Sequence, residues 1–266
     1  MSTPRITAKI ETEAPTPRLA VLIDAENAQA TVIENILKEI ASLGEANVKR
    51  IYGDFTSPQS ASWNKILPEL GIQPIHQLRY AKSKNASDIS LVIDAMDLLY
   101  SGKYDGFCLV SSDSDYTGLA MRLKQEGYRV YGFGEEKTPI PFRNACHKFT
   151  LTEIFRPTYS ASDTTVSDNQ TDSSLNSAPP HSEIPKDIED IFLAALEQLA
   201  SEDGWTPLSG FGSYTNKIKP EFDSRNYGYK KLSDLVRGRN DLFDIEERPV
   251  GSGQKVIYLR GHTKEK

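Results

Sequence analysis

The chain has 266 residues, a net charge of −6 and 38% hydrophobic residues, which is enough apolar material for one large or two modest globular domains. Its two cysteines argue against a disulfide framework and favour a reducing compartment, so we expect a cytoplasmic protein. No stretch approaches the roughly 20 consecutive apolar residues that span a bilayer, which argues against a membrane protein.

The acidity of the chain is concentrated in one segment. Residues 157–183 contain four acidic and no basic residues, together with many Ser, Thr, Asn and Pro residues. This composition cannot bury an apolar core and is typical of a flexible linker. The sequence therefore predicts four parts: a disordered leader at 1–17, an N-terminal domain at 18–156, a flexible acidic linker at 157–183 and a C-terminal domain at 184–262.

Apolar runs and helical patterns alternate along the N-terminal domain. The first run, Leu19 to Ile23, is followed by a polar loop and then by a helical pattern from Val32 to Ile40. Strands that are apolar throughout and alternate with helices indicate an α/β fold with a doubly wound, mainly parallel sheet. The later strands are predicted at 48–55, 72–78, 106–111 and 129–133, and the helices between them at 62–70, 87–100 and 115–126.

Acidic side chains follow the predicted strands at one edge of this sheet. In open α/β sheets the ligand site lies beyond the carboxyl ends of the strands. The residues at these ends are Asp24 and Asn27 after the first strand, Asp113 and Asp115 after the strand at 106–111, and Asp88 at the start of a helix. Carboxylate oxygens are the ligands that Mg²⁺ and Mn²⁺ prefer. We therefore predict a divalent-metal site at this rim.

Several other functions are excluded by missing motifs. No glycine-rich loop follows the first strand, which excludes a dinucleotide or P-loop site, and no Cys and His residues have zinc-site spacing. Divalent ions held by carboxylates activate the attacking water and neutralise the leaving oxygen in phosphodiester hydrolysis. The sequence thus favours this reaction, with four catalytic and metal-binding residues: Asp24, Asp88, Asp113 and Asp115.

Each of these carboxylates also has a structural interpretation. Asp24 could cap a loop by accepting hydrogen bonds from backbone amides. Asp113 and Asp115 lie where a helix N-cap is expected. Asp88 could serve only to stabilise its own helix, through the favourable interaction of a negative charge with the N-terminal end of the helix dipole.

Further residues are expected to support the site. Asn27 could orient the carboxylate three residues before it or contact a phosphate. Asp94 lies on the same predicted helix as Asp88 but is rotated from it by roughly 120°, so we interpret it as a supporting or capping residue. In the loop before that helix, Lys82 and Lys84 are candidates to bind backbone phosphate, although a solvated basic loop has the same composition.

The C-terminal domain combines three predicted helices with a predicted hairpin. The helices lie at 188–199, 211–218 and 229–237, and the strands at 243–246 and 255–259. This order predicts a small winged-helix domain.

Three separated motifs of the N-terminal domain resemble the NYN domain family: residues 22–27, residues 84–88 with Asp94, and residues 111–116. Residues 127–134 and 151–155 extend the match toward the LabA-like bacterial branch, so that the resemblance covers nearly all of 18–156. It implies a PIN-like nuclease fold and RNA as the usual substrate. The metal-binding set that it implies is Asp24, Asp88, Asp113 and Asp115.

The C-terminal domain resembles the LOTUS or OST-HTH family over residues 204–261. The resemblance implies RNA binding or docking, either to a protein partner or to a second copy in a homodimer. Residues 217–239 hold seven basic and three acidic side chains, which favours contact with phosphate; a charged solvent face is the structural alternative. The predicted RNA-binding residues of this domain are Lys217, Lys219, Lys230, Lys231 and Arg237.

The expected function is metal-dependent hydrolysis of RNA, with Mg²⁺ or Mn²⁺ at the rim and the C-terminal domain recruiting the substrate. One alternative is a non-catalytic RNA-binding or regulatory adaptor with a vestigial acidic site. Another is a phosphohydrolase of small phosphate esters, which is disfavoured because no Asp-x-Asp pair follows the first strand.

Overall fold

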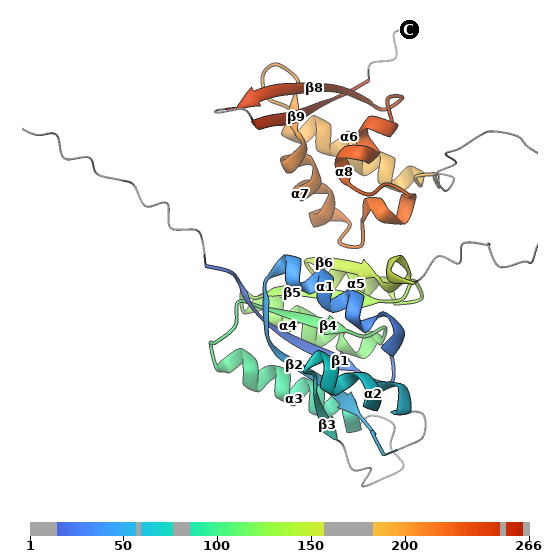
Figure 1. The fold of residues 1–266 in the computed structure, drawn as a ribbon. Coiled ribbons are helices and arrows are strands. Elements are labelled where there is room, and N and C mark those ends of the chain that lie inside the picture. Colours follow the sequence, from blue (N-terminus) through green and yellow to red (C-terminus); the bar gives the residue numbers. More distant parts are fainter. Residues whose placement is uncertain (1–14, 57–59, 77–85, 157–182, 251–253, 263–266) are drawn as a thin grey trace, which may run out of the picture.

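A computed structural model describes residues 15–56, 60–76, 86–156, 183–250 and 254–262, which form two domains (Figure 1). The predicted leader and linker lie outside these ranges except for residues 15–17 and 183. None of the described helices is long and apolar enough to cross a bilayer.

The N-terminal domain is built on one parallel sheet of six strands in the order β3-β2-β1-β4-β5-β6. The two central strands are apolar and buried on both faces, as a sheet covered on both sides requires. The predicted fold class is therefore confirmed. The strands are β1 (Arg18–Asp24), β2 (Glu45–Gly53), β3 (Gln73–His76), β4 (Gly106–Val110), β5 (Arg129–Gly134) and β6 (Lys148–Leu151).

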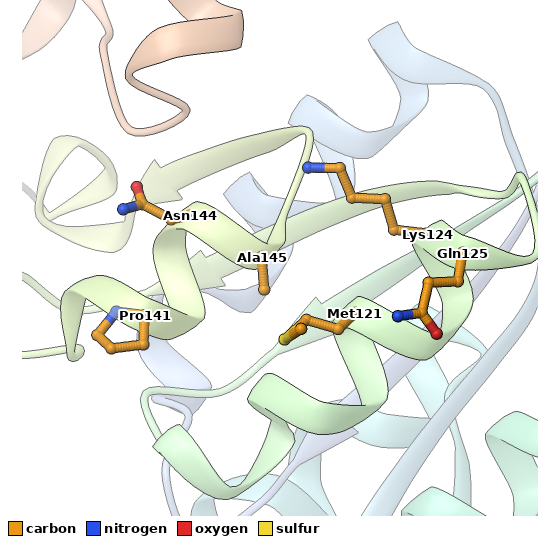
Figure 2. A pocket seen from close by; sticks show the side chains of 6 residues that line it. All are labelled: Met121, Lys124, Gln125, Pro141, Asn144 and Ala145. Carbon is orange, nitrogen blue, oxygen red and sulfur yellow. The ribbon is translucent and has the colours of Figure 1, made fainter.

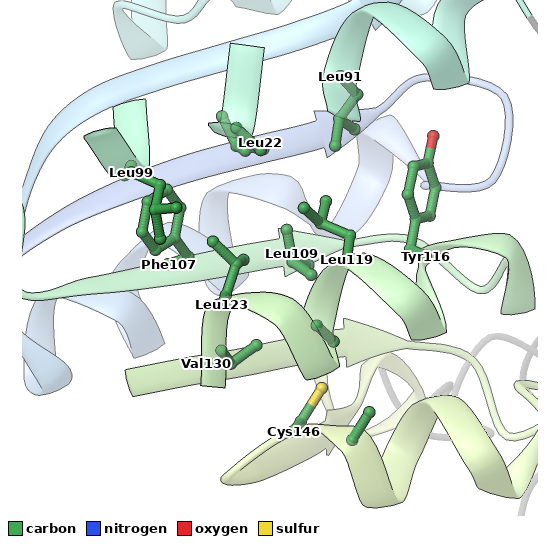
Figure 3. Close-up of a cluster of buried hydrophobic side chains, with 14 of the residues drawn as sticks. Leu22, Leu91, Leu99, Phe107, Leu109, Tyr116, Leu119, Leu123, Val130 and Cys146 are labelled. Carbon is green, nitrogen blue, oxygen red and sulfur yellow. The ribbon is translucent and has the colours of Figure 1, made fainter. Parts of the chain in front are cut away.

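Helices cover both faces of this sheet and form two separate apolar cores. On one face, α3 (Ala86–Tyr100), α4 (Thr117–Gln125) and α5 (Ile140–Ala145) pack over the cluster in Figure 3, with the ring of Tyr116 at one end of it. On the other face lie α1 (Ile33–Leu43) and α2 (Ala61–Leu70). Three short 3-10 turns connect these elements. η1 (Ala30–Val32) precedes α1, η3 (Ser114–Tyr116) precedes α4, and η4 (Thr152–Phe155) follows β6.

Two elements of this domain were absent from the sequence prediction. The helix α5 has six residues and β6 has four, so neither is long enough to show a clear hydrophobic period. Their side chains Phe142 and Phe149 are fully buried and meet edge to face, with ring centroids 5.8 Å apart. Tertiary packing, rather than local pattern, therefore forms this end of the sheet.

The C-terminal domain contains three α-helices and a three-stranded sheet in the order β7-β9-β8. The three helices and the β8-β9 hairpin agree with the predicted winged helix, whereas the two-residue strand β7 was not predicted. Its core is aromatic, and the ring of Phe192 lies 5.2 to 5.8 Å from three neighbouring phenylalanine rings. The elements are α6 (Lys186–Leu199), β7 (Thr206–Pro207), α7 (Leu208–Ile218), η5 (Ser224–Tyr227), α8 (Leu232–Gly238), β8 (Phe243–Val250) and β9 (Gln254–Gly261).

The third helix of this domain begins later than the sequence predicted. A helix was expected from Tyr229, whereas α8 begins at Leu232. The 3-10 turn η5 comes first, and its C-cap is Gly228, whose φ of 83° is left-handed. Glycine adopts this conformation without steric cost, so the chain reverses there before the helix starts.

Gly132 in β5 provides a test of the packing between β5 and β6. A Cβ atom at this position would lie 2.4 Å from the ring of Phe149 and 2.8 Å from the sulfur of Cys146. We expect Gly132→Ala to lower the free energy of unfolding by about 1–3 kcal/mol, the usual cost of overpacking a core. Urea denaturation followed by circular dichroism measures the change.

Gly118 in α4 is the matched control for this substitution. Apart from the glycine, its two chain neighbours and the backbone of its own helix, no heavy atom of the described residues lies within 4 Å of the position of its added Cβ. Gly118→Ala should therefore be neutral or stabilise the helix by up to about 1 kcal/mol. Equal unfolding midpoints for the two variants would contradict the packing described for β5.

Candidate functional site

The candidate site lies at the carboxyl ends of β1 and β4, which are neighbours in the sheet. Ile23 pairs with Val110, so the chain leaves both strands at the same level. Asp24 ends β1, and Ser111 follows β4 directly. The hydroxyl of Ser111 donates a 2.7 Å hydrogen bond to Oδ2 of Asp24, which joins the two strand ends.

Asp24 is a buried carboxylate with four hydrogen bonds. Only 1% of the residue is exposed. Besides Ser111, it accepts hydrogen bonds from the side-chain amide of Asn27 at 2.9 Å and from the backbone amides of Glu26 at 3.0 Å and Asn27 at 3.3 Å. Burial raises the pKa of Asp24, and these hydrogen bonds act in the opposite direction. Asn27 thus orients Asp24, and Asp24 caps its own loop.

Asp113 and Asp115 lie in the turn that follows β4. Oδ1 of Asp113 accepts a 2.9 Å hydrogen bond from the backbone amide of Asp115, so Asp113 is the N-cap of η3. The backbone amide of Asp113 donates to the hydroxyl of Ser111 at 3.0 Å. Ser111 therefore connects the loop of Asp113 to Asp24, while Asp115 is exposed to solvent.

Asp88 lies in the first turn of α3 and contacts the same region through Tyr116. The Tyr116 hydroxyl donates a 2.9 Å hydrogen bond to Oδ1 of Asp88. Burial raises the pKa of Asp88, and the negative charges of Asp24, Asp113 and Asp115 raise it further, against the effect of the Tyr116 hydrogen bond. Asp88 is thus close enough to the other three carboxylates for their charges to act on it.

Among the described residues, no three His, Cys, Asp or Glu side chains are arranged to hold a metal ion. The chemistry of the donors nevertheless fits a hard divalent cation, because all four candidates are carboxylates. Burial is the main cause of the raised pKa of Asp88, and the smaller contribution from the neighbouring carboxylates is one that such a cation would offset. A metal at this rim would be held by oxygen atoms of Asp24, Asp88, Asp113 and Asp115.

Three residues of the rim were missed at the level of the sequence. Ser111 and Tyr116 bind the carboxylates, and Oε1 of Glu26 lies 3.5 Å from the hydroxyl of Ser87, the residue before Asp88. Glu26 lies in the segment 22–27, and Ser111 and Tyr116 lie in the segment 111–116. Their position was visible in the sequence, but their partners were not.

Asp94 has a structural role on the sheet side of α3. It accepts hydrogen bonds from the guanidinium of Arg50 and from the hydroxyl of Tyr52, both on β2. Burial and the neighbouring carboxylate raise the pKa of Tyr52 above its ordinary value. Asp94 therefore ties α3, and with it Asp88, to the sheet.

The predicted phosphate-binding residues differ in their surroundings. Lys82 and Lys84 lie outside the described residues. In the C-terminal domain, Lys219 pairs with Asp187, and Arg237 pairs with Glu247, each at 2.5 Å. The remaining candidates are exposed and form no ion pair with a described residue; they are Lys217, Lys230 and Lys231.

A shallow apolar pocket lies between α4 and α5, and none of the four rim carboxylates lines it (Figure 2). Lys124 is the one charged residue among those that line it. No carboxylate, histidine or cysteine is among the residues that line the pocket, so it is not the candidate site. Its lining consists of Met121, Lys124, Gln125, Pro141, Asn144 and Ala145.

Ser111 is expected to stabilise the rim as well as shape it. Ser111→Ala removes the hydroxyl that donates to buried Asp24 and accepts from the amide of Asp113. Because a buried polar group then loses its partner, we expect the free energy of unfolding to fall by about 1–3 kcal/mol. Ser114, three residues away, is exposed, and Ser114→Ala should change stability by less than about 0.5 kcal/mol. Equal urea midpoints for the two variants would refute the bridging role of Ser111.

Comparison with known proteins places both domains in families. The NYN domain model matches residues 18–153, and the OST-HTH/LOTUS domain model matches residues 182–254. No protein with a curated description matches the chain.

Three solved structures are similar to parts of the chain. The solution structure of an uncharacterized protein from Nitrosomonas europaea is 43% identical, covers 39% of this chain and 96% of its own, and has a TM-score of 0.31. A crystal structure of a protein of unknown function from Vibrio parahaemolyticus is 20% identical, covers 52% of this chain and 93% of its own, and has a TM-score of 0.43. A solution structure of a protein from Chromobacterium violaceum is 34% identical, covers 33% of this chain and 92% of its own, and has a TM-score of 0.26.

The parallel sheet, the order of its motifs and the match over residues 18–153 agree with one another. The chain therefore belongs to the NYN domain family, a nuclease-like family of PIN-like fold, and carries an OST-HTH/LOTUS domain after it.

Proposed function

We propose that the protein is a divalent-metal-dependent ribonuclease that hydrolyses RNA phosphodiester bonds at the acidic rim. The observation that carries the proposal is the hydrogen bonding of Ser111, which joins Asp24 to the loop of Asp113. Asp88 lies near enough to Asp24, Asp113 and Asp115 that their charges add to the effect of burial in raising its pKa. Such a cluster is costly without a cation, and the family of the N-terminal domain is nuclease-like.

Each residue of the rim has a defined task in this proposal. Asp24 is held rigid by Ser111 and Asn27, so its oxygens keep one position while substrate binds and leaves. Tyr116 orients Asp88 through its hydroxyl. When bound, Mg²⁺ or Mn²⁺ supplies the positive charge that polarises the phosphate and lowers the pKa of the attacking water. Asp115 is exposed, so a metal ion that it helps to hold would be open to an incoming RNA strand.

The C-terminal domain is proposed to bind the RNA through lysines that no carboxylate neutralises. Lys217, Lys230 and Lys231 are exposed, and none is paired with a described residue. The outer face of the β7-β9-β8 sheet is less suited to phosphate. Arg248 and Arg260 stack on Trp205 there, and each also pairs with a carboxylate, Asp203 or Asp244.

An adaptor without catalytic activity is the second candidate. It is favoured by the cap that Asp113 forms on η3, because one of its oxygens already accepts a backbone amide. Cleavage assays separate the two candidates.

Asp113→Asn should slow the cleavage of a labelled RNA in Mg²⁺ or Mn²⁺ and leave RNA binding in place. The substitution removes a negative charge from the rim without changing the lysines of the C-terminal domain. We expect a loss of at least about 100-fold in rate, on the order of 3 kcal/mol of transition-state stabilisation. Gel-based cleavage with and without EDTA measures it.

Asp97→Asn is the control for this substitution. Asp97 is an exposed acidic residue of α3, so its replacement makes the same change in charge away from the rim and should leave the rate unaltered. An Asp113→Asn protein that cleaves as fast as the parent would favour the adaptor.

RNA affinity should depend on the unpaired lysines more than on the paired cations. Replacing Lys230 and Lys231 by Gln should reduce the slope of log affinity against log salt by about 1.4, since each phosphate contact to a single strand contributes about 0.7. Replacing Lys219 and Arg237 by Gln removes the same charge from residues held in ion pairs. This matched variant should change the slope less, as measured by fluorescence anisotropy over a salt series. The opposite order would show that the RNA surface lies elsewhere.

A further inference from the structure

The last strand of the sheet, β6, is an edge strand with a partner on its open side. In the sheet it pairs with β5 alone. On the other side, the backbone amide of Phe149 donates a 2.8 Å hydrogen bond to the carbonyl of Pro220, in the loop that follows α7. Figure 1 shows this loop of the C-terminal domain reaching toward β6, with the hairpin β8-β9 on the far side. The unpaired backbone groups of an open edge strand can pair with another chain and cause aggregation, and a segment that covers the edge prevents this.

Beside this hydrogen bond, Arg225 of the C-terminal domain forms a two-pronged ion pair with Glu39 of α1. Nη1 donates to Oε2 and Nη2 donates to Oε1, each at 2.9 Å. Lys148, the first residue of β6, lies 3.2 Å from the same carboxylate. The Glu39 side chain is only 15% exposed, so water screens this contact less than a pair on an open surface.

Arg225 is held in position before it reaches Glu39. Asp223 caps η5 and accepts hydrogen bonds from both the backbone amide and Nε of Arg225, at 3.0 and 2.9 Å. The guanidinium also lies 5.9 Å from the ring centre of Phe155, in η4 of the N-terminal domain. Since its orientation is fixed by Asp223, Arg225 loses little conformational freedom when the domains meet.

We propose that the C-terminal domain docks on the β6 edge of the NYN domain through a latch formed by Glu39 and Arg225. The occupant of this edge is the OST-HTH/LOTUS domain of the same chain, because its loop already satisfies the Phe149 amide and its arginine already satisfies Glu39. The latch makes the two domains one unit in which the RNA-binding surface has a set position relative to the rim.

Docking leaves the acidic rim outside the contact. Between the described residues of the two domains, none of the hydrogen bonds and ion pairs uses Asp24, Asp88, Asp113 or Asp115. The contact lies along the side of the last strand, whereas the rim lies at the carboxyl ends of the central strands. Substrate can therefore reach the rim while the latch is closed.

The latch depends on charge. Hydrogen bonding to Arg225 lowers the pKa of Glu39 below its ordinary value. A carboxyl group with a lowered pKa stabilises the docked state above its free pKa, and this stabilisation is lost as the pH falls through the lowered value. Acid and added salt should both open the latch.

Hydrogen exchange of the Phe149 amide in the full-length protein tests the proposal. Arg225→Gln should raise its exchange rate about tenfold, which corresponds to about 1.4 kcal/mol of lost docking, and should increase the radius of gyration in X-ray scattering. Arg237→Gln makes the same change in charge on an arginine that pairs only inside its own domain, with Glu247. This control should leave the Phe149 amide as protected as in the parent.

Glu39→Gln opens the latch from the other domain and keeps the test valid if Arg225→Gln disturbs the fold of its own domain. It should raise the exchange rate of the Phe149 amide by a similar factor, and the double variant should exchange little faster than either single one. Unchanged exchange in both single variants would overturn the proposal. Asp113→Asn should leave the amide protected whether or not the protein cleaves RNA, so failure of the nuclease proposal is distinguishable from failure of this one.

Discussion

The candidate site depends on one buried contact, the hydrogen bond from Ser111 to Asp24. It joins the ends of the two central strands, and the same serine hydroxyl accepts the amide of Asp113. Asp24 is the end of a strand that is otherwise wholly apolar from Leu19 onward. A charge at this position requires hydrogen-bond partners, and the loops after β1 and β4 supply them. The shape of the rim is thus a consequence of how a buried carboxylate is satisfied.

Electrostatics divides the molecule into two kinds of surface. At the rim, like charges gather, and the pKa values of Asp24 and Asp88 rise, mainly through burial. In the C-terminal domain, most arginines meet carboxylates, whereas a few lysines have no such partner among the described residues. An unbalanced charge attracts a ligand of opposite sign, which supports the proposals of a cation at the rim and of a phosphate at the lysines.

The role of Arg225 could not be read from the charge of the surrounding sequence, because it depends on the side chains that Arg225 contacts. It belongs to the basic stretch 217–239, and from the sequence it counts toward a positive surface. In the structure its guanidinium lies between Asp223 and Glu39 and is neutralised by both. The charge that seemed available to RNA instead connects the two domains.

The sequence by itself determined the α/β class, the winged-helix class and the positions of the acidic residues after the strands, because hydrophobic periods and strand ends are local features. Tertiary structure alone decided the partners of those residues. Tyr116 meets Asp88 across 28 residues, Ser111 meets Asp24 across 87, and Arg225 meets Glu39 across 186. It also formed the short elements α5 and β6, which have too few residues for a period and are held by the contact of Phe142 with Phe149. A pattern in the chain specifies which face of an element is buried, whereas the group that it meets there depends on how distant segments pack.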